Sequence, residues 1–266
     1  MSGFSREWLA MREEEDARAR DGTLPPGLAH PRGDVLRVVD LGAGAGANLR
    51  YLAPRLSLPQ HWTLIDGDNE LLSAVVRPQC AFPLEIEVRQ MDLARGLDGL
   101  PCEGCDLVTA SAFFDLVSRD WLERLAARCA AARVPGGLFA LSVNGRIAWA
   151  PGEPEDGEIA ALFHADMKRD KGFGPALGPA APRALSEAFA AAGYAVRSGD
   201  SSWRLGPTQA DIQNYLLEGY AGVAAAAAPG RAAAITGWAK RRAAHIARGT
   251  SRLTVGHDDV LVKAAQ

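Results

Sequence analysis

The sequence has little of what disulfide-stapled domains and nucleic-acid-binding proteins depend on. Only four of its 266 residues are cysteine, too few for a scaffold held together by disulfides. Its 29 basic and 32 acidic side chains leave a formal charge of −3 and form no basic stripe. We therefore expect no nucleic-acid partner and no polybasic attachment to a membrane surface.

Long apolar runs are also missing. The longest, near residues 221–228, is far shorter than the roughly 20 residues needed to cross a bilayer. Glu13, Glu14 and Glu15 interrupt the N-terminus before the apolar part of a secretory signal could form. These features predict no membrane association and a cytoplasmic location.

Two of the cysteines, Cys102 and Cys105, form a lone CxxC pair. Zinc sites of this type usually combine two such pairs, or one pair with histidines at a matching spacing. Neither accompanies this pair, so we expect reduced cysteines and no metal site.

Strand-like and helix-like segments alternate through the first half of the chain. Strands are predicted at residues 36–41, 61–65, 84–90, 106–110 and 138–143, and helices at 5–20, 47–56, 70–75 and 119–129. In the first helix, Phe4, Trp8 and Met11 would share an apolar face. The alternation is typical of a parallel sheet covered on both faces, which binds ligands at the carboxyl ends of its strands.

The regular alternation ends after Asn144. Residues 145–181 are rich in proline and glycine and are predicted to form an irregular insertion. Beyond it, a helix is predicted from Pro182 to Gly193, strands at 194–197, 202–205 and 260–264, and two more helices at 208–228 and 231–248.

A glycine loop follows the first predicted strand. Gly42, Gly44 and Gly46 would let the backbone approach a ligand and adopt torsions that a Cβ atom disfavours. Asp66 ends the second strand, 20 residues after Gly46, the spacing at which an acidic side chain meets ribose hydroxyls in nucleotide-binding α/β domains. Read strictly, Gly42, Gly44 and Ala47 also satisfy the dinucleotide fingerprint, so an NAD(P)-dependent oxidoreductase is an alternative.

Two further carboxylates distinguish these interpretations. Asp40 directly precedes the loop, where its charge would repel a pyrophosphate but suits an amino group or a sulfonium. Asp92 follows the third strand at the same predicted edge. There it can accept a hydrogen bond from an adenine amine while Leu93 packs against the ring.

Residues 34–144 resemble the class I S-adenosylmethionine-dependent methyltransferases. Residues 38–46 are similar to the first motif of that family, 64–68 to the second, 91–93 to the third and 105–111 to the fourth. Pro135, Gly136 and Gly137 precede the fifth strand in a similar way. The resemblance implies an α/β fold with a doubly wound, mainly parallel seven-stranded sheet, an antiparallel last strand and helical insertions that form a lid.

The resemblance also implies S-adenosylmethionine as cofactor and a role for each matching residue. Asp66 would bind the ribose hydroxyls, and Ser111 would lie near the transferred methyl group. The remaining implied contacts are to the methionine part, from Asp40, Gly42, Gly44 and Gly46, and to the adenine, from Asp92 and Leu93.

The expected reaction is methyl transfer to a small-molecule acceptor. His164 is the candidate general base, and Arg169, beside Lys168 and Lys171, could clamp an acidic acceptor. The chain would form one domain, with an N-terminal helix and linker (1–33), a cofactor-binding core (34–144), the insertion (145–181), and a C-terminal half with a helical lid and last strand (182–266). A non-catalytic scaffold protein that binds an adenosyl ligand is a further alternative.

Overall fold

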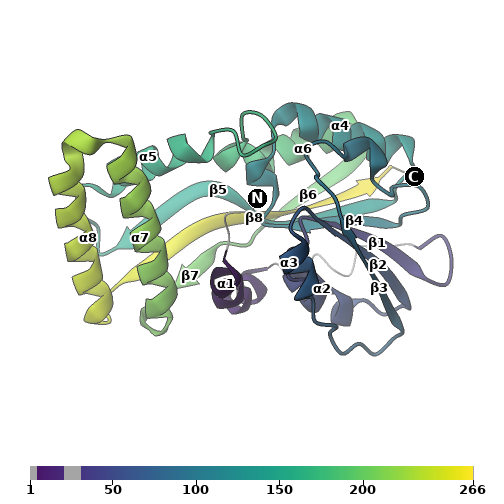
Figure 1. Ribbon diagram of the computed structural model, residues 1–266, viewed down its shortest axis with the longest axis horizontal. Coiled ribbons are helices and arrows are strands. Elements are labelled where there is room, and N and C mark those ends of the chain that lie inside the picture. Colours follow the sequence, from purple (N-terminus) through teal and green to yellow (C-terminus); the bar gives the residue numbers. More distant parts are fainter. Residues whose placement is uncertain (1–4, 21–30, 266) are drawn as a thin grey trace.

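A single mixed sheet with helices on both faces forms the framework of the computed structural model, which describes residues 5–20 and 31–265 (Figure 1). The strands follow the order β3-β2-β1-β4-β5-β8-β6, and β7 also pairs with β8. Their bounds are β1 Leu36–Leu41, β2 Gln60–Asp66, β3 Leu84–Gln90, β4 Leu107–Ser111, β5 Gly136–Ala150, β6 Tyr194–Asp200, β7 Trp203–Leu205 and β8 Arg252–Ala264.

The predicted fold class is confirmed. Strands β1 to β5 pair in parallel, and β8 runs antiparallel to β5, β6 and β7. The described sheet has eight strands in place of the predicted seven, because the three-residue β7 adds to the far end of β8.

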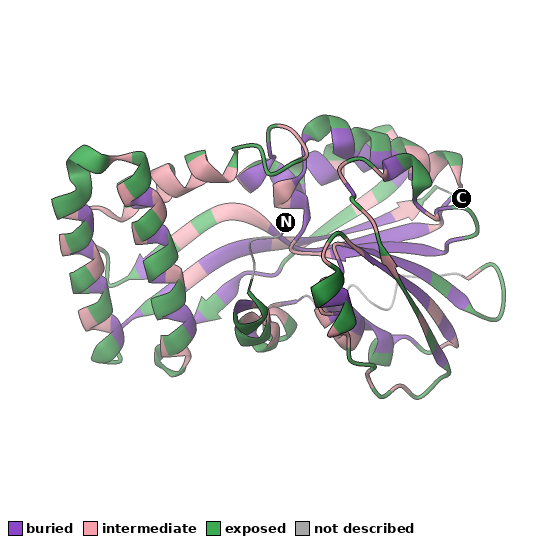
Figure 2. Cartoon of the chain, viewed as in Figure 1, coloured by how far each residue is buried: buried purple, intermediate pink, exposed green. Residues whose placement is uncertain are grey.

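Helices cover both faces of the sheet. In the described part of the chain they are α1 Arg6–Ala19, α2 Ala47–Leu52, α3 Asn69–Ser73, α4 Arg119–Ala131, α5 Asp156–Met167, α6 Ala181–Ala191, α7 Ala210–Ala227 and α8 Ala232–Ala247. Leu49 and Leu52 of α2 pack with β1 and β2 in one apolar core. Leu125 of α4 and Phe189 of α6 pack against the other face. The central strands β1, β2 and β4 are largely buried, whereas the edge strands β3 and β6 are mostly exposed or half-buried (Figure 2).

The predicted irregular insertion at 145–181 is partly wrong. Strand β5 continues to Ala150, and helix α5 lies within the same segment. Between Val143 and Ile147 the pairing with β8 shifts register, and Gly145 adopts a φ of 88°. The glycine therefore marks a bulge inside a long strand rather than its end.

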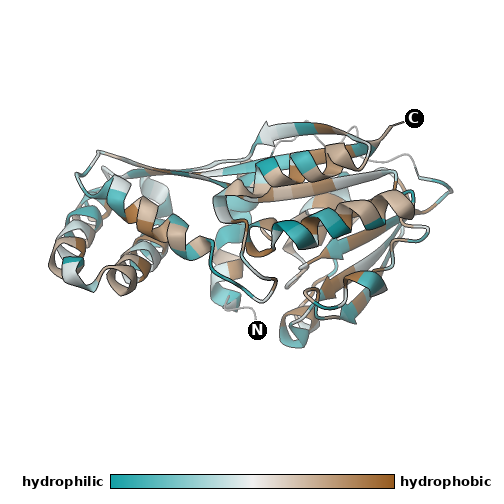
Figure 3. Cartoon of the chain, turned by 90° about the horizontal axis from the view of Figure 1, so that it is seen from above, coloured by the Kyte–Doolittle hydropathy of each residue, from teal (hydrophilic) through white to brown (hydrophobic). Residues whose placement is uncertain are grey.

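Beyond the bulge, β5 and β8 extend away from the main sheet to a cluster formed by α5, α7 and α8 (Figures 1 and 3). Its core includes Ile159, Tyr220 and Trp238. Arg242 of α8 is fully buried there, and its Nε donates to Asp156 Oδ1 of α5 at 3.1 Å. Trp238 Nε1 donates to the same oxygen at 2.8 Å. One carboxylate thus joins two helices.

Helix α1 presents a polar stripe to the interior. Ser5 caps it by accepting a hydrogen bond from Trp8 N at 3.2 Å, as predicted. The predicted apolar face is wrong at Met11, which is 38% exposed, and Phe4 lies outside the described residues. Trp8 is buried, and further along this face Arg12 pairs with Asp16 at 2.9 Å, whereas the buried Arg20 has only a long ion pair of 3.9 Å with Asp259.

Helices able to cross a membrane are absent from the described residues. None of the helices there has both the length and the apolar character that a bilayer span requires.

Candidate functional site

The glycine loop between β1 and α2 has the backbone that its sequence predicts. Gly42, Gly44 and Gly46 have φ values of 63°, 51° and 81°, in the left-handed region that favours glycine. A Cβ atom on Gly42 would lie only 2.6 Å from Phe113 Cδ2. Both the torsion and the close approach therefore require glycine at position 42.

Asp66 is bonded to this loop. Its Oδ2 accepts a hydrogen bond from Gly44 N at 2.8 Å, and its Oδ1 accepts one from Asp68 N at 2.9 Å. Asp68 in turn caps α3, as its position after Asp66 indicates, by accepting from Glu70 N at 2.9 Å. The structure thus places the Asp66 carboxylate at the strand end, beside the loop backbone.

Asp92 follows β3, which pairs with β2 as far as Asp66 and Gln90, so both carboxylates lie at one edge of the sheet. The Asp92 side chain is 60% exposed and accepts a hydrogen bond from Ala94 N at 3.0 Å. The Leu93 side chain belongs to the buried core, and its carbonyl accepts from Trp121 Nε1 at 2.7 Å. The Asp92 side chain therefore faces solvent at this edge, whereas the Leu93 side chain packs into the core.

Asp40 is fully buried and only partly bonded. Its Oδ1 accepts a hydrogen bond from Asn48 Nδ2 at 2.7 Å, whereas its Oδ2 has no hydrogen-bond partner. Burial raises the pKa of Asp40 to about 7, against the opposing effects of the Asn48 hydrogen bond and the Arg20 charge. An unpaired acceptor in such a position is costly unless a ligand completes it.

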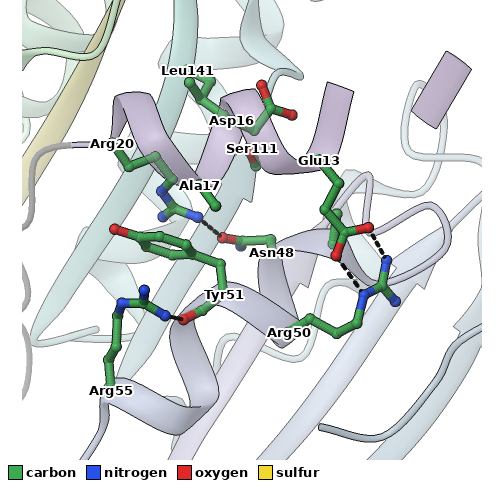
Figure 4. Close-up of a pocket in the computed structure, with 11 residues that line it drawn as sticks. Glu13, Asp16, Ala17, Arg20, Asn48, Arg50, Tyr51, Arg55, Ser111 and Leu141 are labelled. Atoms are coloured by element: carbon green, nitrogen blue, oxygen red, sulfur yellow. Dashed lines mark hydrogen bonds and ion pairs between the residues drawn. The ribbon is translucent and has the colours of Figure 1, made fainter. Parts of the chain in front are cut away.

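A cavity of about 160 Å³ lies under α1, next to the glycine loop (Figure 4). It is smaller than the roughly 300–1,000 Å³ pockets that enclose whole drug-sized ligands, so it can hold only one end of such a ligand. Its lining includes Asp16, Arg20, Asn48, Tyr51, Ser111 and Leu141. Ser111 is the predicted site residue that the structure places here.

Arg20 and Asn48 are the site residues that the sequence analysis missed. Arg20 Nη1 donates to Asn48 Oδ1 at 2.8 Å, and its guanidinium lies 4.0 Å from the centre of the Tyr51 ring. The sequence did contain a signal for Arg20. Trp8, Arg12, Asp16 and Arg20 follow one another at intervals of four residues, so they lie on the same face of the helix as the buried Trp8.

Helix α1 covers the glycine loop. Glu13 accepts two hydrogen bonds from Arg50 of α2, each 2.6 Å long. Leu9 Cδ1 lies 3.9 Å from where a Cβ atom on Gly44 would be. Helix α1 therefore packs against the loop. The segment 145–181, predicted as part of the lid, reaches the same region through Phe173, whose ring lies 5.7 Å from that of Phe113.

The two candidate catalytic residues lie apart from this cavity lining. Arg169 is 77% exposed and forms an ion pair of 3.1 Å with Asp166. His164, on α5, is half-buried, and its Nε2 has no hydrogen-bond partner. Burial and the neighbouring Lys168 lower the pKa of His164, so it is neutral at pH 7.

The CxxC cysteines are free thiols within the core. Cys102 and Cys105 are both buried. Within the described residues, no three histidine, cysteine, aspartate or glutamate side chains are placed to hold a metal ion.

Comparison with known protein families identifies the core of the sheet. A family model described as "Methyltransferase domain" matches residues 38–137, the segment that carries the glycine loop and the edge carboxylates. Residues 38–137 therefore carry a methyltransferase domain. The match does not support the dehydrogenase interpretation of the glycine loop. No curated protein sequence matches the chain.

Solved structures of methyltransferases are similar over most of the chain. A cyclopropane synthase from Mycobacterium tuberculosis is 13% identical, with 99% of this chain and 87% of that chain covered and a TM-score of 0.48. An S-adenosylmethionine-dependent methyltransferase from Archaeoglobus fulgidus is 14% identical, with 98% of this chain and 100% of that chain covered and a TM-score of 0.48. Geranyl diphosphate C-methyltransferase from Streptomyces coelicolor A3(2) is 12% identical, with 99% of this chain and 88% of that chain covered and a TM-score of 0.46.

Proposed function

We propose that this methyltransferase domain binds S-adenosylmethionine along the edge from the glycine loop to Asp92 and transfers its methyl group to a small-molecule acceptor. Asp66 would bind the ribose, and Asp92 the adenine amine. Asp40 would face the amino-acid end, and Ser111 would lie near the methyl group. The single observation that carries the proposal is the unpartnered Asp40 Oδ2, buried at the start of the glycine loop.

The chemistry of these residues fits the donor. S-adenosylmethionine supplies a methyl group on a sulfonium, a leaving group that is already activated. The protein then has to hold the acceptor in line and exclude water, which accounts for much of the acceleration in such reactions. The loop glycines allow close approach, and Asp40 supplies a negative charge for the cationic end.

Charge supports a small-molecule acceptor. The chain has nearly balanced charge, and several arginines near the cavity are already paired, such as Arg50 with Glu13 and Arg12 with Asp16. Nucleic acid binding requires clustered basic side chains that are available to phosphates.

Calorimetric titration tests donor binding. S-adenosylmethionine and S-adenosylhomocysteine should bind and raise the Tm, because a ligand that binds only the folded state stabilises it. NADH and NADPH should do neither. The opposite preference would contradict the proposal, and donor binding without any methyl product would favour the non-catalytic scaffold.

Donor binding should also depend on the protonation of Asp40. Raising the pH through about 7 ionises this carboxyl and strengthens binding of a cationic amino group, and lowering the pH weakens it. At pH 6 we expect roughly tenfold weaker binding of S-adenosylhomocysteine than at pH 8. With a pKa of about 7, only about a tenth of the Asp40 carboxyl groups are ionised at pH 6, against about nine tenths at pH 8. Asp40→Asn should bind weakly with no such pH dependence. An unchanged pH profile in this variant would exclude Asp40 as the titrating group.

We further propose that His164 accepts the acceptor's proton, since its lowered pKa leaves the imidazole neutral and able to act as a base. His164→Gln should lower kcat about 100-fold or more on a protonated acceptor and leave donor affinity nearly unchanged. Arg169→Gln should raise the KM of an acidic acceptor. If both variants turn over the identified acceptor normally, neither residue has the proposed role.

A further inference from the structure

The guanidinium of Arg20 is buried with two donors to spare. Its side chain is 2% exposed, and neither Nε nor Nη2 has a hydrogen-bond partner. Nε and Nη2 share one edge of the guanidinium, the edge that donates two parallel hydrogen bonds to a carboxylate. Burying such donors unpaired is costly, so their place beside a cavity indicates a ligand that completes them.

Neighbouring groups already hold the rest of this side chain. Nη1 is bonded to Asn48 Oδ1, and the flat face lies over the Tyr51 ring. Asp259 forms a long ion pair with this edge, because its Oδ2 lies 3.9 Å from Arg20 Nε, a distance too long for a hydrogen bond. Asp259 Oδ1 accepts from Leu141 N at 2.8 Å. The guanidinium is thus oriented while its carboxylate-binding edge stays unbonded.

A matching unpaired group of opposite charge lies on the other side of Asn48. Asn48 Nδ2 donates to Asp40 Oδ1, and Asp40 Oδ2 has no partner. Asn48 therefore separates a carboxylate oxygen that accepts no hydrogen bond from two guanidinium nitrogens that donate none. An α-amino acid end, with an ammonium next to a carboxylate, has the complementary arrangement of charges.

We infer that Arg20 binds the carboxylate of the donor's amino-acid end, opposite the Asp40 site for its ammonium, and that α1 is therefore part of the donor site. This inference rests on the proposed function. It adds a binding residue that lies outside the four motifs of residues 34–144. It also gives the Glu13–Arg50 ion pair a role, since that pair holds α1 against α2.

Two ligands and three variants test this assignment by calorimetry. S-adenosylhomocysteine carries the carboxylate, and 5′-S-(3-aminopropyl)-5′-thioadenosine keeps the amine without it. The wild-type protein should prefer S-adenosylhomocysteine about 10- to 100-fold, the usual effect of hydrogen bonds to a charged group. Arg20→Gln should lose this preference while binding the aminopropyl ligand as the wild type does. Arg20→Lys, which keeps the buried charge but not the paired donors, should keep only part of it.

Arg55→Gln is the matched control, because Arg55 lines the same cavity and lies over the same Tyr51 ring. It should keep the full preference. Loss of the preference in Arg55→Gln rather than Arg20→Gln would overturn the assignment, as would equal wild-type affinity for the two ligands. If Arg20→Gln instead raises only the KM of an acidic acceptor, the carboxylate belongs to the acceptor and the donor assignment is wrong. Failure of the wild type to bind either ligand would reject the proposed function itself.

Discussion

Asp66→Ala should weaken binding of S-adenosylhomocysteine by roughly ten- to over a hundredfold, equivalent to about 1.5–3 kcal/mol. The variant loses the charged acceptor for the ribose hydroxyls. It also loses the acceptor that holds Gly44 N at 2.8 Å, so the glycine loop is less well positioned for the ligand. Calorimetric titration of the folded variant measures this loss.

Asp68→Ala is the control for this change. Asp68 is a carboxylate two residues further on, but it caps α3 and accepts from Glu70 N. Its removal should cost about 1 kcal/mol of stability and leave ligand affinity nearly unchanged. Equal affinities in the wild type and in Asp66→Ala would show that Asp66 is only a strand-end residue that braces the loop.

Asp156→Ala should lower the free energy of unfolding by about 3–5 kcal/mol, because it leaves the buried Arg242 without its carboxylate. Trp238 Nε1 and Glu153 N would lose the same carboxylate as acceptor, at 2.8 Å each. Urea denaturation followed by tryptophan fluorescence measures the change, since Trp238 is fully buried in this cluster.

Glu158→Ala, on the same helix, tests whether burial is the cause. Glu158 pairs with Arg231 at 2.8 Å, but both side chains are about half exposed. Such exposed pairs contribute less than about 1 kcal/mol. An equal loss in the free energy of unfolding for the two substitutions would mean that the buried pair stabilises the contact between α5 and α8 no more than the exposed pair does.

The sequence predicted well the edge of the sheet that carries the glycine loop, because the signals for it are local. Each βα unit carries its own apolar run and turn residues. The apolar run of each strand locates its end, and Gly42 and Asp66 lie at two of these ends. The first and third strands, residues 36–41 and 84–90, match the structure at both ends. The parallel pairing then brings Asp66 and Asp92 to one edge without any further information.

Features set by long-range packing were not predictable in this way. Gly145 looks like a strand end, but β8 provides a partner on both sides of the bulge, so β5 continues. Arg20 looks like a solvated residue at a helix end. Only the packing of α1 against Asn48 and Tyr51 makes it a buried part of the cavity.

A crystal structure of the protein with S-adenosylhomocysteine tests the central claim most directly. We predict ribose hydroxyls within hydrogen-bond distance of Asp66 and the amino group of the ligand beside Asp40 Oδ2. The sulfur should lie on the Ser111 side of the glycine loop. A ligand bound elsewhere, with Asp40 Oδ2 still unpaired and no contact to Asp66, would contradict the account.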